Sequence, residues 1–476
     1  MERTTARMIR EAGERGISGG YYQLETVRER MLEFLGKSPT RRATAVYLVG
    51  ADGRSGFTEP TPIDSLPRLL DSGLDVERSL WDRELLLFDI DIEYQNFDRP
   101  TLAWKDPGRV FRLQEPILTA ALDFLRDRLI DPLVLVSGRG YHLVWAISRG
   151  SRAFRRLAKL GYVPPTLATR YAAVRSPRGE RVDLELGRAF AGQGQVAEYL
   201  GHRIRGAAME RSVLPIQLTA LEVGTGAAGR EIVSLDLSEY GDPIHTRHIR
   251  LPFSLYLKPR EPRWQLEESE LQRLLPIVEI PVGTLTGSEA SALARCPARV
   301  AALAASATVK IPVFSRQMDR VITEYEDSRL GQWHRNSSCR IADAPAGTSR
   351  DGGTQRAPPC LDWLFARAND WLLKPAALQH AVRILTSLNW PPSAIARRIY
   401  ESYRSDCSWG RTWISMDPAY RAEFYTRLFA GMIHTGADSL IDLNCVSHQE
   451  KGYCHVPACR SNLVDFRDLL QRRRTA

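Results

Sequence analysis

Two acidic residues, Asp89 and Asp91, stand two positions apart in the apolar run Glu84–Glu93 (ELLLFDIDIE). Alternate residues of a strand point to the same face, so both carboxylates would project together, roughly 7 Å apart along the backbone. Carboxylate oxygens are preferred ligands of hard cations such as Mg²⁺ or Mn²⁺. Two buried carboxylates repel each other unless a cation lies between them. The pattern therefore predicts a divalent-metal site, and the alternative is an edge strand whose acids face water.

The segment 133–147 (LVLVSGRGYHLVWAI) contains a glycine turn between two apolar strands. Glycines let the backbone approach a ligand closely and expose its N–H groups to phosphate oxygens. An arginine can bind phosphate through two charge-assisted hydrogen bonds, and serine and histidine side chains add donors. The segment is a candidate cradle for a nucleoside triphosphate, although an ordinary hairpin would also use its glycines for the turn. The candidate ligands are Ser137, Gly138, Arg139, Gly140 and His142.

A third segment, residues 241–258 (GDPIHTRHIRLPFSLYLK), places one acid ahead of a basic run. Asp242 could complete a metal site, and Asp236 is the alternative third acid. His248 and Arg250 could neutralise phosphates beside the metal. The other interpretation of this segment is a surface loop that leads into a solvated strand.

Together these three segments resemble the archaeo-eukaryotic primase superfamily. Its members carry an acidic D-x-D strand, an S-G-R-G-x-H-type loop and a later Asp followed by a basic strand. The order and approximate spacing are similar to those of the small catalytic primase subunit. The resemblance implies two-metal nucleotidyl transfer, with Mg²⁺ or Mn²⁺ held by Asp89, Asp91 and Asp242. It also implies that Ser137, Arg139 and His142 hold the incoming triphosphate, and that His248 and Arg250 contact phosphates.

The sequence departs from that family in two places. Many small subunits carry a cysteine-rich zinc knuckle, but the first cysteine of this chain is Cys296. Tyr256 stands where some relatives have a histidine in the P-F-S-x-H stretch. The resemblance therefore covers the three motifs but neither of these features.

Three of the seven cysteines fall between residues 445 and 459, a clustering typical of metal binding. Four thiolates suit either an iron–sulfur cluster or a structural zinc ion. The predicted ligands are Cys360, Cys445, Cys454 and Cys459. Rival ligands are Cys339 and, if the metal is zinc, His448 and His455. Cys296 and Cys407 are instead expected to act as small apolar residues.

Residues 355–465 resemble the C-terminal domain of the large primase subunit. In that family, four separated cysteines close a helical domain around a 4Fe–4S cluster. The PPC-x-x-x-L start and the G-Y-C-x-x-x-x-C end of this segment carry the resemblance. It implies a 4Fe–4S cluster rather than Zn²⁺, in a helical module that binds the template and the 5′ end of the new primer.

Composition sets broad limits on the class of protein. The 476 residues suggest two or three domains, and a hydrophobic content of 43% is enough for packed cores. The net charge of +9 favours an acidic partner such as nucleic acid. The sequence has no apolar run of membrane-spanning length, and its charged N-terminus is unlike a secretion signal, so we expect a cytoplasmic protein without membrane contacts.

Hydrophobic periodicity predicts an α/β core followed by helices. The expected strands are Glu84–Glu93, Leu133–Val136, Tyr141–Ile147 and a strand near Glu231–Leu237, with a helix around Pro116–Leu129. Further helices are expected within residues 1–36 and at Leu266–Leu275, Ser288–Ala305 (broken at Pro297), Leu361–Ala376, Leu378–Leu388, Pro392–Tyr403 and Ser461–Arg474. The predicted class is α+β, a primase core with an RRM-like sheet followed by a mainly α-helical C-terminal domain. The predicted boundaries are a catalytic domain at 1–262, a helical connection at 263–334, a linker at 335–359 and a metal domain at 360–476.

These features predict a DNA-dependent primase-polymerase, a nucleotidyltransferase that starts primers de novo and extends them. Its expected partners are a single-stranded DNA template, a primer strand and NTPs or dNTPs. One alternative keeps the same site in a gap-filling or repair polymerase that only extends primers. The other is a non-catalytic nucleic-acid-binding protein with a degenerate site.

Overall fold

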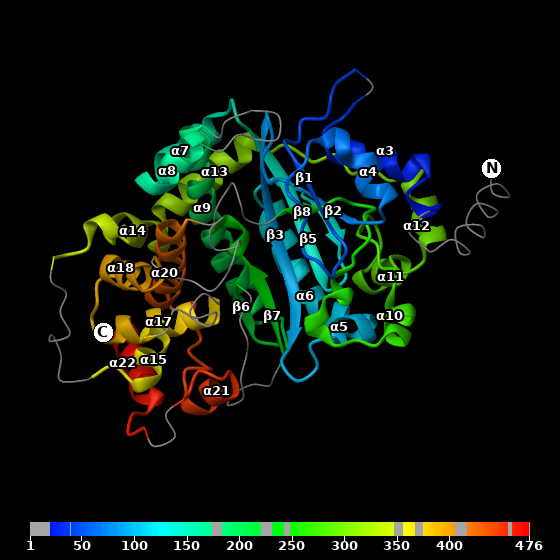
Figure 1. Ribbon diagram of the computed structural model, residues 1–476. Coiled ribbons are helices and arrows are strands. Elements are labelled where there is room, and N and C mark those ends of the chain that lie inside the picture. The colour runs from blue at the N-terminus through cyan, green and yellow to red at the C-terminus, as the bar shows by residue number, and fades with distance from the viewer. Residues whose placement is uncertain are drawn as a thin grey trace.

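The computed structural model describes residues 20–38, 40–173, 183–219, 231–241, 248–346, 356–366, 375–404, 417–455 and 459–475. The chain combines a mixed sheet with many helices, and the C-terminal helices gather to one side of the sheet (Figure 1). Within the described ranges, no helix has the length and apolar character needed to cross a membrane.

The central sheet has six strands in the order β6-β7-β3-β5-β4-β9. Its longest strand, β3 (Leu85–Asn96), pairs antiparallel with β5 (Gly140–Ser148) and with β7 (Glu231–Asp236). The outer strands are β4 (Leu133–Val136), β9 (Ile280–Pro281) and β6 (Ile216–Leu218). Because β3 has a neighbour on each side, its backbone is paired along both edges, and most of its apolar side chains and Asp89 are buried.

The two faces of β3 meet different surroundings. Ile92 and its cross-strand partner Tyr141 lie on the face covered by α6 (Pro107–Arg126), whose Phe111 meets the Tyr141 ring edge-on. The long helix α9 (Leu184–Ala208) packs against both α6 and β3. Side chains alternate along a strand, so Asp89 and Asp91 point to the other face.

A second, three-stranded antiparallel sheet has the order β1-β2-β8. Its strands are β1 (Leu48–Ala51), β2 (Asp75–Arg78) and β8 (Ile249–Arg250). In Figure 1 these strands lie beside β3 and β5. Glu77 of β2 interacts electrostatically with His142 of β5, so the second sheet lies against the acidic face of the first.

Helices make up the rest of the described chain. Those near the sheets are α3 (Glu25–Phe34), α4 (Leu66–Asp71), α5 (Leu102–Lys105), α7 (Arg152–Leu160), α8 (Pro165–Ala173), α10 (Glu268–Leu274), α11 (Gly287–Leu293), α12 (Pro297–Ala304), α13 (Ser315–Asp327) and α14 (Arg329–Asn336). The later ones are α15 (Pro359–Ala366), α17 (Pro375–Ser387), α18 (Pro392–Tyr403), α20 (Pro418–Thr435), α21 (Cys445–Glu450) and α22 (Leu463–Thr475).

A buried ionic cluster joins the helices near the sheet to the C-terminal helices. Glu198 of α9 accepts two hydrogen bonds from Arg427 of α20, at 2.6 and 3.0 Å. His334 of α14 lies 3.2 Å from the other oxygen of the same carboxylate. Removing one partner of such a buried pair costs about 3–5 kcal/mol, so the cluster fixes α20 against α9.

Most of the predicted elements are confirmed, with shifts at their ends. β4 and α18 have the predicted bounds, and Pro297 separates α11 from α12 as expected. The helix predicted from Pro116 begins at Pro107, because Asp106 caps it through the Arg109 N–H. Residues 263–334, predicted as a helical connection, also contribute β9 to the sheet and place α11 on α6.

Gly140 provides a test of the sheet register. A Cβ at this position would collide with the backbone oxygen of Ile92 on the neighbouring strand. We expect Gly140→Ala to lower the free energy of unfolding by about 1–3 kcal/mol or more, because the pairing of β3 with β5 would have to shift. Thermal unfolding of the full chain measures this change.

Gly206→Ala in α9 is the matched control, because a Cβ there meets nothing within 4 Å. Alanine is the better helix former, so this variant should unfold at the same or a higher temperature. Equal losses in the two variants would contradict the β3–β5 register.

Candidate active site and candidate metal centre

Three of the predicted site residues meet on adjoining strands. Asp91 of β3 is the direct cross-strand partner of His142 on β5 and of Asp236 on β7. Facing residues of an antiparallel pair have their Cβ atoms about 4.5–5.5 Å apart. Asp89, two residues earlier, points the same way. The sheet therefore places three carboxylates and one imidazole at neighbouring positions on one of its faces.

The sequence offered two candidates for the third acid, Asp242 and Asp236. Asp242 lies outside the described residues. The alternative, Asp236, ends β7, is buried and faces Asp91 across the strand pair. Its position is fixed by the same register that fixes Asp91, so Asp236 is the third acid that the described part of the chain supplies.

His142 is engaged with the acids in this structure. Its Nδ1 lies 2.8 Å from Oδ2 of Asp89. Burial opposes a charge on the imidazole, but the carboxylates of Asp89 and Asp91 outweigh it and raise the pKa of His142 well above its usual range. The acids therefore favour the imidazolium form of His142, which would partly neutralise the acidic pair.

The metal fit of this site can be judged from its oxygen atoms. Among the described residues, the buried Oδ1 of Asp89 has no hydrogen-bond partner. Burial raises the pKa of Asp91 to about 7, with Glu93 and Asp236 adding to the shift against the pull of His142. No three acidic, histidine or cysteine side chains in the described ranges lie close enough to bind one ion as they stand. An all-oxygen donor set with an excess of negative charge fits a hard divalent cation.

The glycine turn is the predicted hairpin between β4 and β5, but its polar side chains face inward. Ser137 and Arg139 are buried, and the Arg139 N–H donates to the Ser137 hydroxyl. The Arg139 guanidinium donates to the Tyr94 carbonyl at 3.2 Å and lies 3.6 Å from Glu93. A Cβ on Gly138 would overlap the Tyr256 ring. The turn is thus tightly packed, and Arg139 already has an acidic partner.

Arg250 is likewise held by acids rather than free. Its guanidinium lies 2.7 Å from Asp75, 2.8 Å from Glu77 and 3.5 Å from Glu279. It also covers the ring of Tyr256 at 4.6 Å. His248 lies near the same cluster, with Nδ1 at 3.9 Å from Glu77. Both basic residues predicted from the third segment therefore reach the space between the two sheets.

Sequence reasoning missed the acids that surround Arg250. Asp75 and Glu77 alternate on β2 in the same way as Asp89 and Asp91 on β3. Glu279 stands just before β9 and is fully buried. The alternating acids were a usable signal, but nothing local to residue 279 indicated that it faces β8.

Burial leaves this acidic cluster only partly ionised. It raises the pKa of Glu77 to about 7, where Arg250 opposes the shift and Asp75 supports it. It also raises the pKa of Glu279 to about 8, against the opposing charges of His142 and Arg250. Bound protons therefore reduce the negative charge of this cluster, as a bound cation also could.

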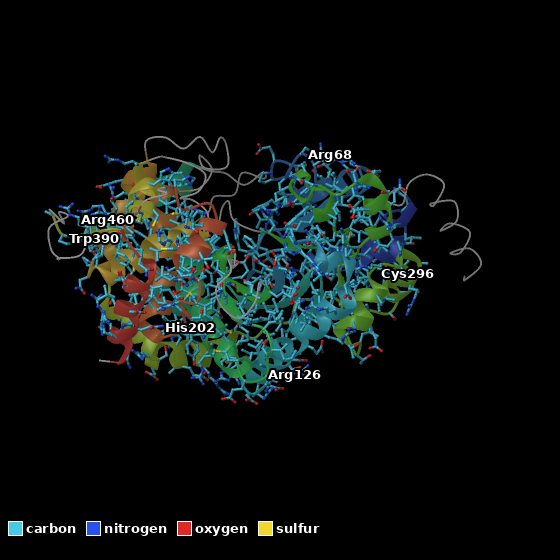
Figure 2. All side chains as sticks on the ribbon, turned by 90° about the horizontal axis from the view of Figure 1, so that it is seen from below. Arg68, Arg126, His202, Cys296, Trp390 and Arg460 are labelled. Carbon is cyan, nitrogen blue, oxygen red and sulfur yellow. The ribbon has the colours of Figure 1, made fainter. Side chains whose placement is uncertain are left out.

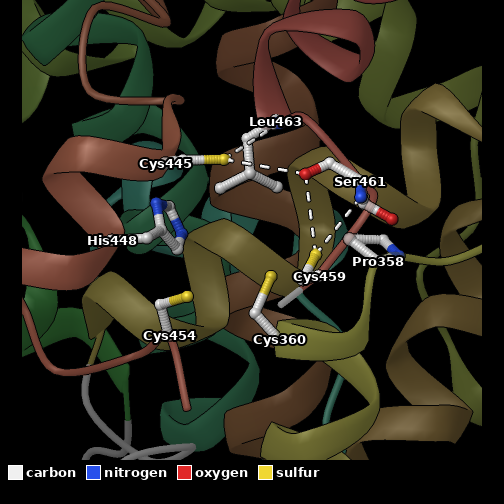
Figure 3. Close-up of a pocket in the computed structure, with 8 residues that line it drawn as sticks. All are labelled: Pro358, Cys360, Cys445, His448, Cys454, Cys459, Ser461 and Leu463. Atoms are coloured by element: carbon white, nitrogen blue, oxygen red, sulfur yellow. Dashed lines mark hydrogen bonds between the residues drawn. The ribbon is translucent and has the colours of Figure 1, made fainter. Parts of the chain in front are cut away.

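The four predicted cysteines converge on one cavity of about 20 Å³ (Figure 3). Cys360 comes from α15, Cys445 begins α21, and Cys454 and Cys459 come from the following segment. Burial raises the pKa of the Cys360 thiol to about 12, and the other three thiols add to the shift. Thiols up to 99 positions apart in the sequence are thus close enough to influence one another's pKa.

Backbone donors already point at two of these sulfur atoms. The Leu463 N–H donates to Cys445 Sγ at 3.4 Å, and the Ser461 N–H donates to Cys459 Sγ at 3.3 Å. N–H···S hydrogen bonds stabilise thiolates and tune metal–thiolate centres. The donor set and its surroundings fit a thiolate-bound metal group.

The rival ligands lie less favourably. Cys339 is buried beside a different cavity, with Arg427 and Glu423. His455 stacks on Trp363, with ring centroids 3.7 Å apart. His448 lines the cysteine cavity, but its Nδ1 lies 3.1 Å from the Asn444 carbonyl and its Nε2 lies 2.7 Å from His380. Cys296 lies just before α12, at the other end of the molecule from Arg460, which follows Cys459 in the sequence (Figure 2), and Cys407 lies outside the described residues.

No family model, curated protein or solved structure matches this chain. The interpretation of both sites therefore depends on the geometry and chemistry of the chain's own residues.

The pKa of Glu279 gives a test of the acidic cluster. The unfolded chain releases the Glu279 proton near pH 4.5 and the folded chain near pH 8. Since the folded state binds the proton more tightly, this carboxyl costs the wild type stability as the pH rises through that window. We expect Glu279→Gln to unfold at a higher temperature than the wild type at about pH 8.5, and at a similar temperature at about pH 5.

Glu59→Gln, at an exposed position, controls for the loss of one charge. Melting curves of the three proteins at both pH values measure the effect. A Glu279→Gln variant that gains nothing at the higher pH would contradict the buried, proton-holding carboxyl.

Proposed function

We propose that the chain is a template-dependent nucleotidyltransferase of the primase-polymerase type, which joins nucleoside triphosphates on single-stranded DNA. The observation that carries the proposal is the strand register that brings Asp91, Asp236 and His142 together, with Asp89 beside them. The three acids come from two segments separated by more than 140 residues. A packing role alone does not explain so much buried negative charge at one point.

Asp89, Asp91 and Asp236 would hold two divalent cations. Bound Mg²⁺ or Mn²⁺ would lower the pKa of an attacking 3′-hydroxyl and neutralise the leaving pyrophosphate. Positioning and charge neutralisation supply most of the catalysis in such transfers, so no general base is required. The raised pKa of Asp91 means that a cation would replace a proton there.

The basic residues would bind the triphosphate by exchanging partners. His142, whose imidazolium form the acids favour, would pass from Asp89 to a phosphate oxygen once a cation neutralised the carboxylate. Arg250 and His248 reach the same inter-sheet space from β8 and the residue before it. Arg139 is held by Glu93 and the Tyr94 carbonyl, so its role would be to support the turn unless that pairing opens.

The four cysteines would bind a 4Fe–4S cluster. The four thiols line one cavity and come from separated segments of the chain. Four thiolates suit a cluster or a zinc ion, and the resemblance of residues 355–465 to the large primase subunit favours the cluster.

The acidic pair gives the first test of function. We expect Asp89→Asn with Asp91→Asn to reduce DNA synthesis by at least about 10³-fold, because the cation-binding charge is lost. The measurement is product formation from dNTPs or NTPs with Mg²⁺ or Mn²⁺, on unprimed and on primed single-stranded templates.

Asp131→Asn, at a surface ion pair with Arg126, is the control and should keep full activity. New products on the unprimed template support initiation, and products on the primed template alone support the extension-only alternative. Wild type inactive on both templates would contradict the proposal, as would full activity of the double variant.

The cysteine site gives an independent test. Protein purified without oxygen should be brown and carry four irons per chain, and Cys445→Ser should lose most of the iron and the colour. Metal analysis and the visible spectrum measure both. Cys296→Ser, remote from the cavity, should keep them. A colourless wild type that carries one zinc per chain would contradict the cluster and assign a zinc ion to the four cysteines. The proposal for the acidic site would be unaffected.

A further inference from the structure

A second cavity among the C-terminal helices has walls suited to a planar aromatic ligand. It measures about 350 Å³, within the range of small-molecule sites. Its aromatic walls are Trp333 of α14, Trp390 and His434 of α20. The rings of Trp333 and His434 stack with centroids 5.9 Å apart and planes 28° apart. The stacked pair and Trp390 give the cavity an aromatic lining, which favours a flat ligand such as a nucleobase.

The charges at this cavity all have one sign. Arg329 of α14 and Arg473 of α22 line it, and no acidic residue is among the described residues that do so. Burial and the nearby charge of Arg329 lower the pKa of His434, so the arginines supply the positive charge. A ligand with an aromatic ring and a negative group would complement both the aromatic side chains and the positive charge of the cavity.

Trp390 is held on a rigid turn. Asn389, just after the end of α17, has the left-handed backbone angle φ 66°. The Trp390 N–H donates to the Leu385 carbonyl at 3.0 Å. Pro391 and Pro392 follow and begin α18. Such a turn presents the indole at little entropic cost on binding.

Two polar side chains also line the cavity, those of Thr386 and Asn389. The Asn389 amide is exposed and can bond the polar edge of a base whose faces lie against the aromatic rings. The Thr386 Oγ1 is buried and makes no hydrogen bond to any described residue, so it could bond the same base only after its side chain rotated.

A neighbouring cavity indicates that the ligand is a nucleic-acid strand rather than a single nucleotide. The two cavities share Ser337, and the second measures about 490 Å³. Its wall includes Lys159, Arg335 and Arg340, with Arg340 over the Tyr162 ring at 4.2 Å, and two acids, Asp343 and Glu423. A nucleoside triphosphate usually brings Mg²⁺ held by carboxylates, and the described wall of the first cavity has none.

We propose that the cavity between α14, α17, α18, α20 and α22 binds an unstacked base and the adjacent phosphate of single-stranded DNA. The base lies among Trp333, Trp390 and His434, and Arg329 and Arg473 neutralise the phosphate. The strand continues past Ser337 toward Arg340 and Tyr162. This inference deepens the proposed function, because the bound strand would be the template.

Figure 2 places Trp390 on the side of the molecule formed by the C-terminal helices, away from Cys296 at the other end. None of the residues that line the cavity belongs to the acidic site, so strand binding can be measured without added nucleotide and therefore without the chemistry. The site would add template affinity.

The test uses the full-length protein and fluorescein-labelled oligo(dT), with binding followed by anisotropy without added metal or nucleotide. We expect Trp390→Ala to weaken binding about tenfold, because one stacked base is lost, with an unchanged salt dependence. Arg329→Glu should weaken binding and also reduce the slope of log K against log[salt] by at least about 0.7, because a phosphate contact is lost.

Arg320→Ala is the matched control, because Arg320 is exposed on α13 and does not line the cavity. Arg329 is itself exposed, so its variant keeps the test decisive even if Trp390→Ala fails to fold. Variants that bind oligo(dT) as tightly as Arg320→Ala would overturn the inference. Displacement of the oligonucleotide by an equal concentration of dTTP or dTMP would overturn the assignment to a strand.

The Asp89→Asn, Asp91→Asn double variant separates this inference from the proposed function. It should bind oligo(dT) as the wild type does. If the wild type makes no DNA but the Trp390 and Arg329 variants still lose binding, the proposed function fails and the strand site stands. If synthesis proceeds and those variants bind normally, only the strand site fails.

Discussion

The burial of carboxylates between two sheets is the constraint on which the rest of the structure depends. The buried Asp89 and Asp236 and the half-buried Asp91 come from the central sheet, and the buried Asp75 and Glu77 come from the smaller one. Water would solvate such charges far better than a protein interior does. His142 and Arg250 offset part of their charge, and burial favours the protonated form of Asp91.

The same constraint explains why the site is built on strands. β3 is paired on both sides, so the positions of Asp89 and Asp91 cannot drift with a surface loop. Gly140 lets β5 approach β3 where a side chain would collide with Ile92. The stacked rings of Phe88 and Trp145, 5.3 Å apart, secure the opposite face. Rigid neighbours hold repelling groups close together, which a flexible segment would not do.

Sequence patterns predicted the elements that have strong local signals. The apolar alternation around Asp89 predicted β3, and the glycines at 138 and 140 predicted the turn before β5. Pro297 predicted the break between α11 and α12. Each of these signals lies within a few residues of the feature that it predicts, so neighbouring residues alone were sufficient.

The features that the sequence did not predict depend on contacts between distant segments. Arg250 looked like a free phosphate ligand, but it pairs with Asp75, about 175 residues away, and with Glu279. The spacing of the cysteines gave no choice between His448 and a fourth thiol. In the structure His448 lines the same cavity as the four thiols, with its Nε2 2.7 Å from His380 Nδ1. Such pairings are set by how helices and strands pack, and no local pattern encodes them.

The cysteine cavity and the ionic cluster around Glu198 both involve the C-terminal helices. Arg427 fixes α20 to α9, and Arg383 of α17 forms a buried pair with Asp438 just beyond α20. Closing the long segment between Cys360 and Cys445 costs chain entropy, which grows slowly with loop length. α17 and α20 lie within that segment, and the Arg383–Asp438 pair holds α17 against the residues that follow α20. The four thiols are therefore arranged by the packing of the helices, and a metal group would bind to a site that is largely formed beforehand.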